Sequence, residues 1–187
     1  MVNAVSAVVL GSAVFACGAP PAGTAAPADS PPRSRAAAGV EDGVVPDGRR
    51  LSPLSPHDAG LPAIAKLDPK LLHAVRRAAR DAAGDGVDIF VTTGWRSRAY
   101  QQRLFDAAVV RYGSERDARR TVSTPEESHH VTGDAVDIGP TDADSWLSQH
   151  GSEYGLCQTY ANEMWHFELA TTPGGVCPEM HADASNG

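Results

Sequence analysis

Five side chains in two short stretches of this sequence are candidates to bind a metal ion or exchange a proton. They are His129, His130 and Asp137 in SHHVTGDAVDIG, and Glu163 and His166 in NEMWHFEL. A catalytic zinc ion typically takes three protein ligands from His, Asp and Glu and leaves a fourth position for water. A further Glu beside the ion can act as general base toward that water. The two stretches therefore hold the residue types of a hydrolytic metal centre.

The spacing of the first stretch requires the chain to reverse. Ligand atoms on one zinc ion lie about 3–4 Å apart, whereas seven extended residues would separate His130 from Asp137 by about 23 Å. A glycine within residues 132–134 predicts the reversal, because glycine accepts turn conformations that other residues avoid. On the strand that follows, Ala135 and Asp137 share one face, so Asp137 can face a cleft while its neighbours face the core. Spacing alone leaves open whether His129 or His130 is its partner.

In the second stretch, Glu163 and His166 are three residues apart. They would share a face of a helix but would point to opposite sides of a regular strand. Asn162 suggests a turn at Glu163, with a strand starting near Trp165, and both side chains would then reach one cleft. Each pattern alone is also common in solvated loops, and His166 could be a core histidine bonded to backbone. Their coincidence in one small domain favours a metal site.

The elements that would position these residues alternate between helices and short strands. Apolar periodicity and capping residues predict helices near residues 69–84, 97–112, 115–119 and 141–147, and strands near residues 87–93, 135–138, 156–160 and 165–170. This pattern predicts an α+β domain, in which a small antiparallel sheet carries flanking helices on one side.

The N-terminal part of the chain has a different character. Residues 1–17 are apolar and uncharged; they are too short for a comfortable membrane span but have the length and composition of a secretory signal peptide, although no Lys or Arg stands near the start. Cys17 resembles the acylated cysteine of a bacterial lipoprotein; alternatively, it leaves with an ordinary signal peptide. Residues 18–60 are rich in Ala, Pro and Gly and predict a disordered linker.

A single folded domain is expected at residues 61–179, followed by a disordered tail at residues 180–187. Cys157 and Cys177 flank its C-terminal part and could form a disulfide, which would add about 3 kcal/mol of stability. The formal net charge of −7, from 16 basic and 23 acidic residues, argues against nucleic-acid binding.

Three blocks of the chain resemble a known family. TTGWRSRAYQQRLF, SHHVTGDAVDIG and EMWHFEL are similar to the signature blocks of the zinc D-alanyl-D-alanine carboxypeptidases of the VanY type, which are related to VanX dipeptidases and hedgehog-like folds. The pattern is Gly-aromatic-Arg-Ser, then Ser-x-His-x-x-Gly-x-Ala-x-Asp, then Glu-x-Trp-His. The resemblance covers residues 61–177 and implies a hedgehog/D,D-peptidase-like fold.

The resemblance also implies a metal centre. One Zn²⁺ ion would be held by His130, Asp137 and His166, because the second block aligns only in the register that places His130 at the ligand position. Glu163 resembles the general base. His129 stands where the family often has Glu, which makes it a neighbour at the rim of the site.

Further roles follow from the same resemblance. Arg96 resembles the residue that stabilises the charged oxygen of the transition state, a contribution that can reach about 3–4 kcal/mol. Ser128 and Gln101 match positions near the substrate, and Trp165 lines the site or packs behind the last ligand. Without the resemblance, Arg96 would be interpreted as a surface ion-pair residue.

The implied protein is an exported zinc metallopeptidase that removes the terminal D-alanine from peptidoglycan stem peptides. It would be a monomer, either extracellular or associated with the cell wall, and would touch the membrane only if Cys17 carries a lipid. The alternatives are a D-Ala-D-Ala dipeptidase, an L,D-carboxypeptidase or a cross-link endopeptidase on the same fold. A non-catalytic peptidoglycan-binding zinc module is a further alternative, although such a module should have lost Glu163 or Arg96.

Overall fold

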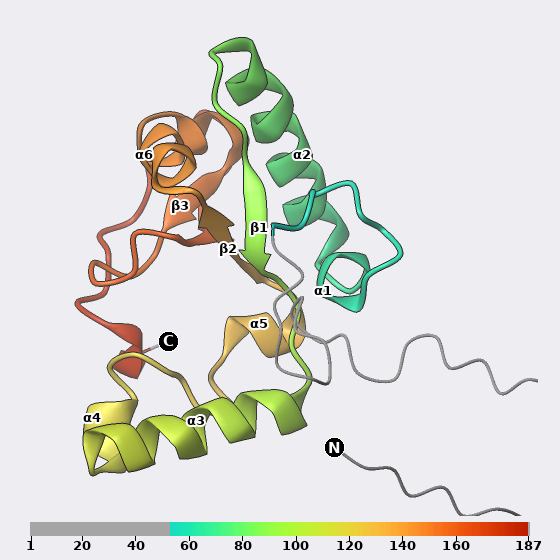
Figure 1. Cartoon of the computed structure of the whole chain (residues 1–187). Coiled ribbons are helices and arrows are strands. Elements are labelled where there is room, and N and C mark those ends of the chain that lie inside the picture. The colour runs from blue at the N-terminus through green and yellow to red at the C-terminus, as the bar shows by residue number, and fades with distance from the viewer. Residues whose placement is uncertain (1–52, 187) are drawn as a thin grey trace, which may run out of the picture. The chain divides into compact units, whose positions relative to one another are not determined.

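A four-stranded antiparallel sheet forms the centre of the domain. The computed structural model describes residues 53–186 (Figure 1). The strands are β1 (Phe90–Thr93), β2 (Ala135–Gly139), β3 (Leu156–Gln158) and β4 (His166–Leu169). Their order in the sheet is β1-β2-β4-β3, and every neighbouring pair is antiparallel. The predicted α+β class with a small antiparallel sheet is therefore confirmed.

Six α-helices and two 3₁₀ helices are found within the described residues. They are α1 (Pro62–Ala65), α2 (Pro69–Gly84), α3 (Arg98–Tyr112), α4 (Glu115–Ala118), α5 (His129–Thr132), α6 (Thr141–His150), η1 (Gly151–Tyr154) and η2 (Ala184–Asn186). The start of α2 agrees with the prediction, since the Asp68 side chain accepts hydrogen bonds from the backbone N–H groups of Lys70 and Leu71. Helix α6 is longer than predicted and leads directly into η1.

The main core lies between one face of the sheet and helices α2 and α6. The face alternation of β2 sends Val136 and Ile138 into this core, where Phe167 of β4 joins them. The apolar stripe of α2 and the buried residues of α6 complete the core: Leu71, Val75, Ala78, Ala143 and Leu147. A second, smaller cluster joins α3 to α4 and consists of Phe105, Ala108 and Ala118. In Figure 1, α5 lies between the strands and α3.

The first strand and the turn before β2 differ from the predictions. β1 begins at Phe90 rather than Val87, because the N–H of Val87 donates to Ala82 O at the end of α2. The predicted reversal before β2 occurs, but the short helix α5 precedes it. Gly133 then adopts a left-handed φ of 87°. A Cβ at this position would lie 2.4 Å from Lys66 O, so only glycine fits without a shift of backbone.

The prediction of a disordered tail at residues 180–187 is corrected by the structure. Up to residue 186 this C-terminal segment lies against the domain, because His181 N–H donates to Thr159 O and its own carbonyl accepts from Ala161 N–H. Ala184 is 3% exposed. The predicted disulfide between Cys157 and Cys177 is present and ties the start of this segment to β3. Backbone pairing and the disulfide supply order that composition did not indicate.

The N-terminal boundary of the domain also lies earlier than residue 61. Leu54 forms a two-way backbone pair with Val91, with N···O distances of 3.2 and 2.8 Å. The predicted signal peptide at residues 1–17, with Cys17, and the predicted linker up to residue 52 lie outside the described residues. Among residues 53–186, no helix is long and apolar enough to cross a membrane.

Candidate metal centre and active site

Strand register places two of the predicted ligands side by side. Asp137 of β2 lies directly opposite His166 of β4 in the antiparallel ladder. Residues opposite each other in such a ladder project from the same face of the sheet. This face is turned away from the core that holds Val136 and Phe167. The prediction that Asp137 faces a cleft while its neighbours face the core therefore agrees with the structure.

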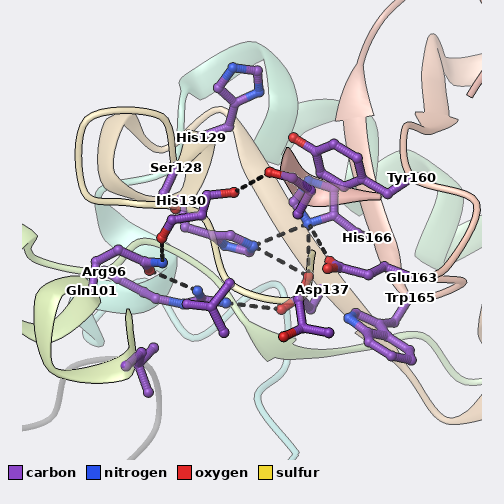
Figure 2. A pocket seen from close by; sticks show the side chains of 15 residues that line it. Arg96, Gln101, Ser128, His129, His130, Asp137, Tyr160, Glu163, Trp165 and His166 are labelled. Carbon is purple, nitrogen blue, oxygen red and sulfur yellow. Dashed lines mark hydrogen bonds and ion pairs between the residues drawn. The ribbon is translucent and has the colours of Figure 1, made fainter. Parts of the chain in front are cut away.

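The third predicted ligand, His130, comes from α5. The reversal at Gly133 brings this helix back toward β2. His130 Nε2 lies 3.3 Å from Asp137 Oδ1 and 3.3 Å from His166 Nδ1, and His166 Nδ1 lies 3.2 Å from Asp137 Oδ1. All three residues are buried, and they form a His/Asp/His group that could hold a metal ion (Figure 2).

The triangle of donor atoms fits zinc. Tetrahedral bonds of about 2.0–2.1 Å place neighbouring ligand atoms roughly 3.3 Å apart, which is the separation of each pair here. Two imidazole nitrogens and a carboxylate oxygen are also ligand types that zinc prefers. Of the histidine pair that the sequence left open, His130 points into the triangle, whereas the ring of His129 points away from it (Figure 2).

Both ligand rings are held by acceptors on their far side. His130 Nδ1–H donates to Gly94 O at 2.9 Å. His166 Nε2–H donates to Glu168 Oε1 at 2.8 Å. Carbonyl and carboxylate oxygens only accept, so each bond places the proton on the outer nitrogen and leaves the inner nitrogen free to bind a metal.

Glu163 lies beside the triangle. The backbone turns before β4, where Glu163 N–H donates to Tyr160 O and His166 N–H donates to Glu163 O. Glu163 Oε2 consequently lies 3.9 Å from His166 Nδ1. Burial raises the pKa of Glu163 to about 7. A cation in the triangle would favour the charged carboxylate and lower this pKa. The turn inferred from Asn162 is thus present.

The pKa values of the two ligand histidines shift in opposite directions. Burial, with the nearby Arg96 guanidinium, lowers the pKa of His130 to about 4. Burial also disfavours the charged form of His166, but its hydrogen bonds to Asp137 and Glu168 outweigh this and raise its pKa to about 9. The histidine next to two carboxylates is therefore the one that holds a proton most strongly when no metal is bound.

Arg96 is fixed against the same carboxylate. Its Nη2–H donates to Asp137 Oδ2 at 3.1 Å, and its Nη1–H donates to Gln101 Oε1 at 2.9 Å. Gln101, which is 1% exposed, donates in turn to Ser123 O at 2.8 Å. Both polar ends of Gln101 are thus occupied by protein. It lines the pocket, as predicted, but its contacts are those of a support for Arg96.

The remaining predicted residues line the same cavity. Ser128 is buried at the start of α5, and Trp165 is 42% exposed at the edge of the cavity. Tyr160 also lines the cavity and was not predicted; its ring centroid lies 4.9 Å from that of His166. Further lining comes from Leu104, which lies in the first block but had no predicted role, and from residues outside the three blocks: Thr121, Val122, Ser123 and Ala184. Only the fold brings these residues to the site.

Comparison with known proteins identifies the family of the chain. The family model of the VanY D-alanyl-D-alanine carboxypeptidases matches residues 64–172, more than half of the chain. The chain belongs to this family. It is accordingly a hydrolase of the D-alanyl-D-alanine carboxypeptidase type, which confirms the family and the enzyme class inferred from the three blocks. A search of curated proteins found no match.

Several solved structures share the fold. A mutant of the vancomycin resistance D,D-pentapeptidase VanY in complex with Zn(II) is 24% identical, with a TM-score of 0.52, and the match covers 58% of this chain and 73% of that one. VanYB in complex with D-alanine-D-alanine is also 24% identical, with a TM-score of 0.51 and coverage of 55% and 70%. The LdcB LD-carboxypeptidase reaches 24% identity, a TM-score of 0.50 and coverage of 58% and 60%.

Proposed function

We propose that this VanY family member is a D,D-carboxypeptidase that uses one zinc ion, held by His130, Asp137 and His166, to release the terminal D-alanine from peptidoglycan stem peptides. The observation that carries the proposal is the triangle of donor atoms, 3.2–3.3 Å on each side, with Glu163 and Arg96 at its edges. Bound zinc would polarise the scissile carbonyl and lower the pKa of a water molecule.

Glu163 is the proposed general base. Its carboxylate takes a proton from the attacking water and delivers it to the leaving amine of D-alanine, so that one water is consumed for each peptide bond cleaved. The side chain is held at the edge of the triangle by the turn before β4. Its burial among protein groups keeps bulk water from competing for the proton.

Arg96 is the proposed stabiliser of negative charge. Its guanidinium is positioned by Asp137 Oδ2 on one side and by Gln101 on the other. A donor fixed before the reaction begins can stabilise the oxyanion without further reorganisation. Its presence beside Glu163 favours an enzyme over a non-catalytic zinc module.

The proposed substrate pocket is the cavity next to the triangle. Ser128, Gln101 and Trp165 line it, and we add Tyr160 to this set. Trp165 offers an apolar surface for the alanine methyl groups, while Ser128 offers a hydroxyl for the peptide backbone.

The proposed location is outside the cytoplasm, because peptidoglycan stems are cell-wall components. This agrees with residues 1–17 acting as a secretory signal, with Cys17 as a lipid attachment site and residues 18–52 as a linker. The protein would act as a monomer.

The test is to incubate the full chain and zinc with a synthetic pentapeptide stem that ends in D-Ala-D-Ala. Mass spectrometry should show the loss of one D-alanine. Loss of a dipeptide would assign a dipeptidase-type activity, and cleavage only of tetrapeptide stems would assign an L,D-carboxypeptidase. Cleavage of cross-linked stems alone would assign an endopeptidase. The Glu163→Gln variant is the control for contaminating peptidases.

A further inference from the structure

We infer that Glu168 is a positioning residue that fixes His166 as a metal ligand, and that the partly exposed His129 holds Glu168 in place. The inference rests on the proposed metal centre, but it assigns roles to two residues that are not metal ligands themselves. A path of hydrogen bonds leads from the partly exposed His129 to Glu168 and from Glu168 to His166. Its contacts come from the strand that carries the ligand and from the helix that carries the second ligand, His130.

Strand geometry explains how Glu168 reaches the ligand. Residues two apart on a strand project from the same face, so Glu168 stands beside His166 on the site face of β4. The residue opposite Glu168 on β2 is Ala135, whose small side chain leaves space for the carboxylate. Glu168 Oε1 then accepts the Nε2–H of His166 at 2.8 Å.

The Glu168 carboxylate holds and activates the ligand His166 more strongly than a backbone carbonyl would. His130 Nδ1–H donates to the neutral Gly94 O, whereas His166 donates to a full negative charge. A charged acceptor makes a stronger hydrogen bond, fixes the ring orientation more tightly and makes the inner nitrogen a better donor to the metal. Of the two ligand histidines, His166 is thus the one whose affinity for the metal depends on a partner side chain.

Glu168 is itself held by other side chains. Its Oε2 lies 2.7 Å from His129 Nδ1, and its Oε1 also accepts from Thr159 Oγ1 at 3.1 Å. Three donors therefore surround one carboxylate that is 9% exposed, which offsets the cost of burying its charge. The side chain of His129 is 43% exposed. This neighbour of the ligand, expected only at the rim, thereby stands at the outer end of the path.

The test is the zinc affinity of the full chain, measured by competition with a chromophoric chelator. Removing such an outer partner typically costs 10–100-fold in metal affinity, so Glu168→Ala should weaken zinc binding by about that factor. Glu168→Gln should weaken it less, because the amide oxygen can still accept from His166. The matched control is Glu153→Gln, which removes the charge from the exposed His150–Glu153 pair, with an Nδ1–Oε1 distance of 3.3 Å, and should leave the affinity unchanged.

A double-mutant cycle tests the outer link. His129→Ala should weaken zinc binding by a smaller factor than Glu168→Ala and should have no further effect in the Glu168→Ala background. Additive effects would overturn the assignment of His129 as acting through Glu168.

A spectroscopic readout separates positioning from mere support of the fold. With Co(II) in place of zinc, Glu168→Gln should shift the visible d–d bands, because these respond to the donor strength of the ligands. Affinities within twofold of the original chain, with unchanged Co(II) bands in both Glu168 variants, would overturn the inference. Absence of zinc binding by the original chain would instead reject the metal centre itself.

Discussion

Two walls of the same cavity rest on different parts of the molecule. The ligand wall, formed by His130, Asp137 and His166, stands on strands whose other face is packed into the main core, and on the short helix α5. The substrate wall consists of residues that precede α5, one residue of α3 and one of the C-terminal segment: Leu104, Thr121, Val122, Ser123 and Ala184. The apolar cluster that α3 shares with α4 has only three buried members.

The two walls differ in how precisely their residues must be positioned. Metal ligands need to be held within a fraction of an ångström, and strands packed on a core provide that rigidity. Substrate-contacting segments can change length and sequence without disturbing the core. We therefore expect substitutions in the ligand wall to abolish activity and those in the substrate wall to alter substrate preference.

The largest effect is expected for His166→Ala. Loss of one of three ligands should abolish stoichiometric zinc binding, and activity should fall below detection. Elemental analysis of the purified protein measures the bound zinc. The contrasting variant is Val122→Ala in the substrate wall, which should keep a full equivalent of zinc. Equal zinc loss in both variants would contradict the distinction between the walls.

The next effect separates metal binding from proton transfer. Glu163→Gln should retain zinc, because Glu163 is not part of the donor triangle, while kcat should fall about 10²–10⁴-fold. Steady-state assays on a pentapeptide stem, together with zinc analysis, measure both quantities. Unchanged kcat in a zinc-loaded variant would remove Glu163 from the role of base.

The sequence predicted the residues of the ligand wall better than those of the substrate wall. The ligand wall follows from local rules: a glycine reversal before β2, face alternation at Asp137 and a turn at Glu163. Glu168 obeys the same period of two as His166 and could have been found by it. The substrate wall depends on contacts between distant segments, such as that of Ser123 Oγ with Ala184 O. No pattern within either segment indicates such a contact.

The C-terminal segment shows the same limit in another form. Its composition predicted disorder, yet pairing with residues 159–161 orders it. Helix α5 is four residues long, which is too short for a periodic signal, and it was not predicted, although α4 of the same length was. Local sequence thus predicted the chemistry better than it predicted the cavity around it.

Arg96 connects the two walls, because it bonds both to Asp137 and to Gln101 of α3. Arg96→Ala should lower kcat about 10²–10³-fold, the usual cost of losing one oxyanion donor. Gln101→Ala should show a smaller loss in kcat with zinc retained, since its polar atoms hold Arg96 and the Ser123 backbone in place. A larger loss for Gln101→Ala than for Arg96→Ala would reverse this order.

The disulfide tests the support of the substrate wall. Replacing Cys157 and Cys177 by Ser opens a link across 20 residues and should lower the free energy of unfolding by about 3 kcal/mol. Because the C-terminal segment carries Ala184, KM should rise while zinc affinity stays constant. Denaturant unfolding and zinc titration measure the two effects. Reduced zinc affinity in the folded double variant would show that the segment also supports the ligand wall.

The smallest effect concerns a buried carboxylate behind the ligand wall. Asp144 of α6 is buried, and its Oδ1 has no hydrogen-bond partner among the described residues. Burial, with the charge of Asp137, raises the pKa of Asp144 from 3.8 to about 6. Ionising it is therefore harder in the folded than in the unfolded chain. The Asp144 carboxyl does not affect the free energy of unfolding below pH 3.8. It lowers this free energy progressively between pH 3.8 and pH 6, and by a constant amount above pH 6.

Asp144→Asn should consequently raise the free energy of unfolding at pH 7 by up to about 3 kcal/mol and leave it nearly unchanged at pH 3.5. Thermal unfolding at the two pH values measures the difference. The matched control is Asp142→Asn, two residues earlier in the first turn of α6 and exposed, which should change stability little at either pH. A gain for Asp144→Asn that is equal at both pH values would point to better packing rather than to the buried charge. The buried charge of Asp144, behind the ligand wall, would then not lower the free energy of unfolding.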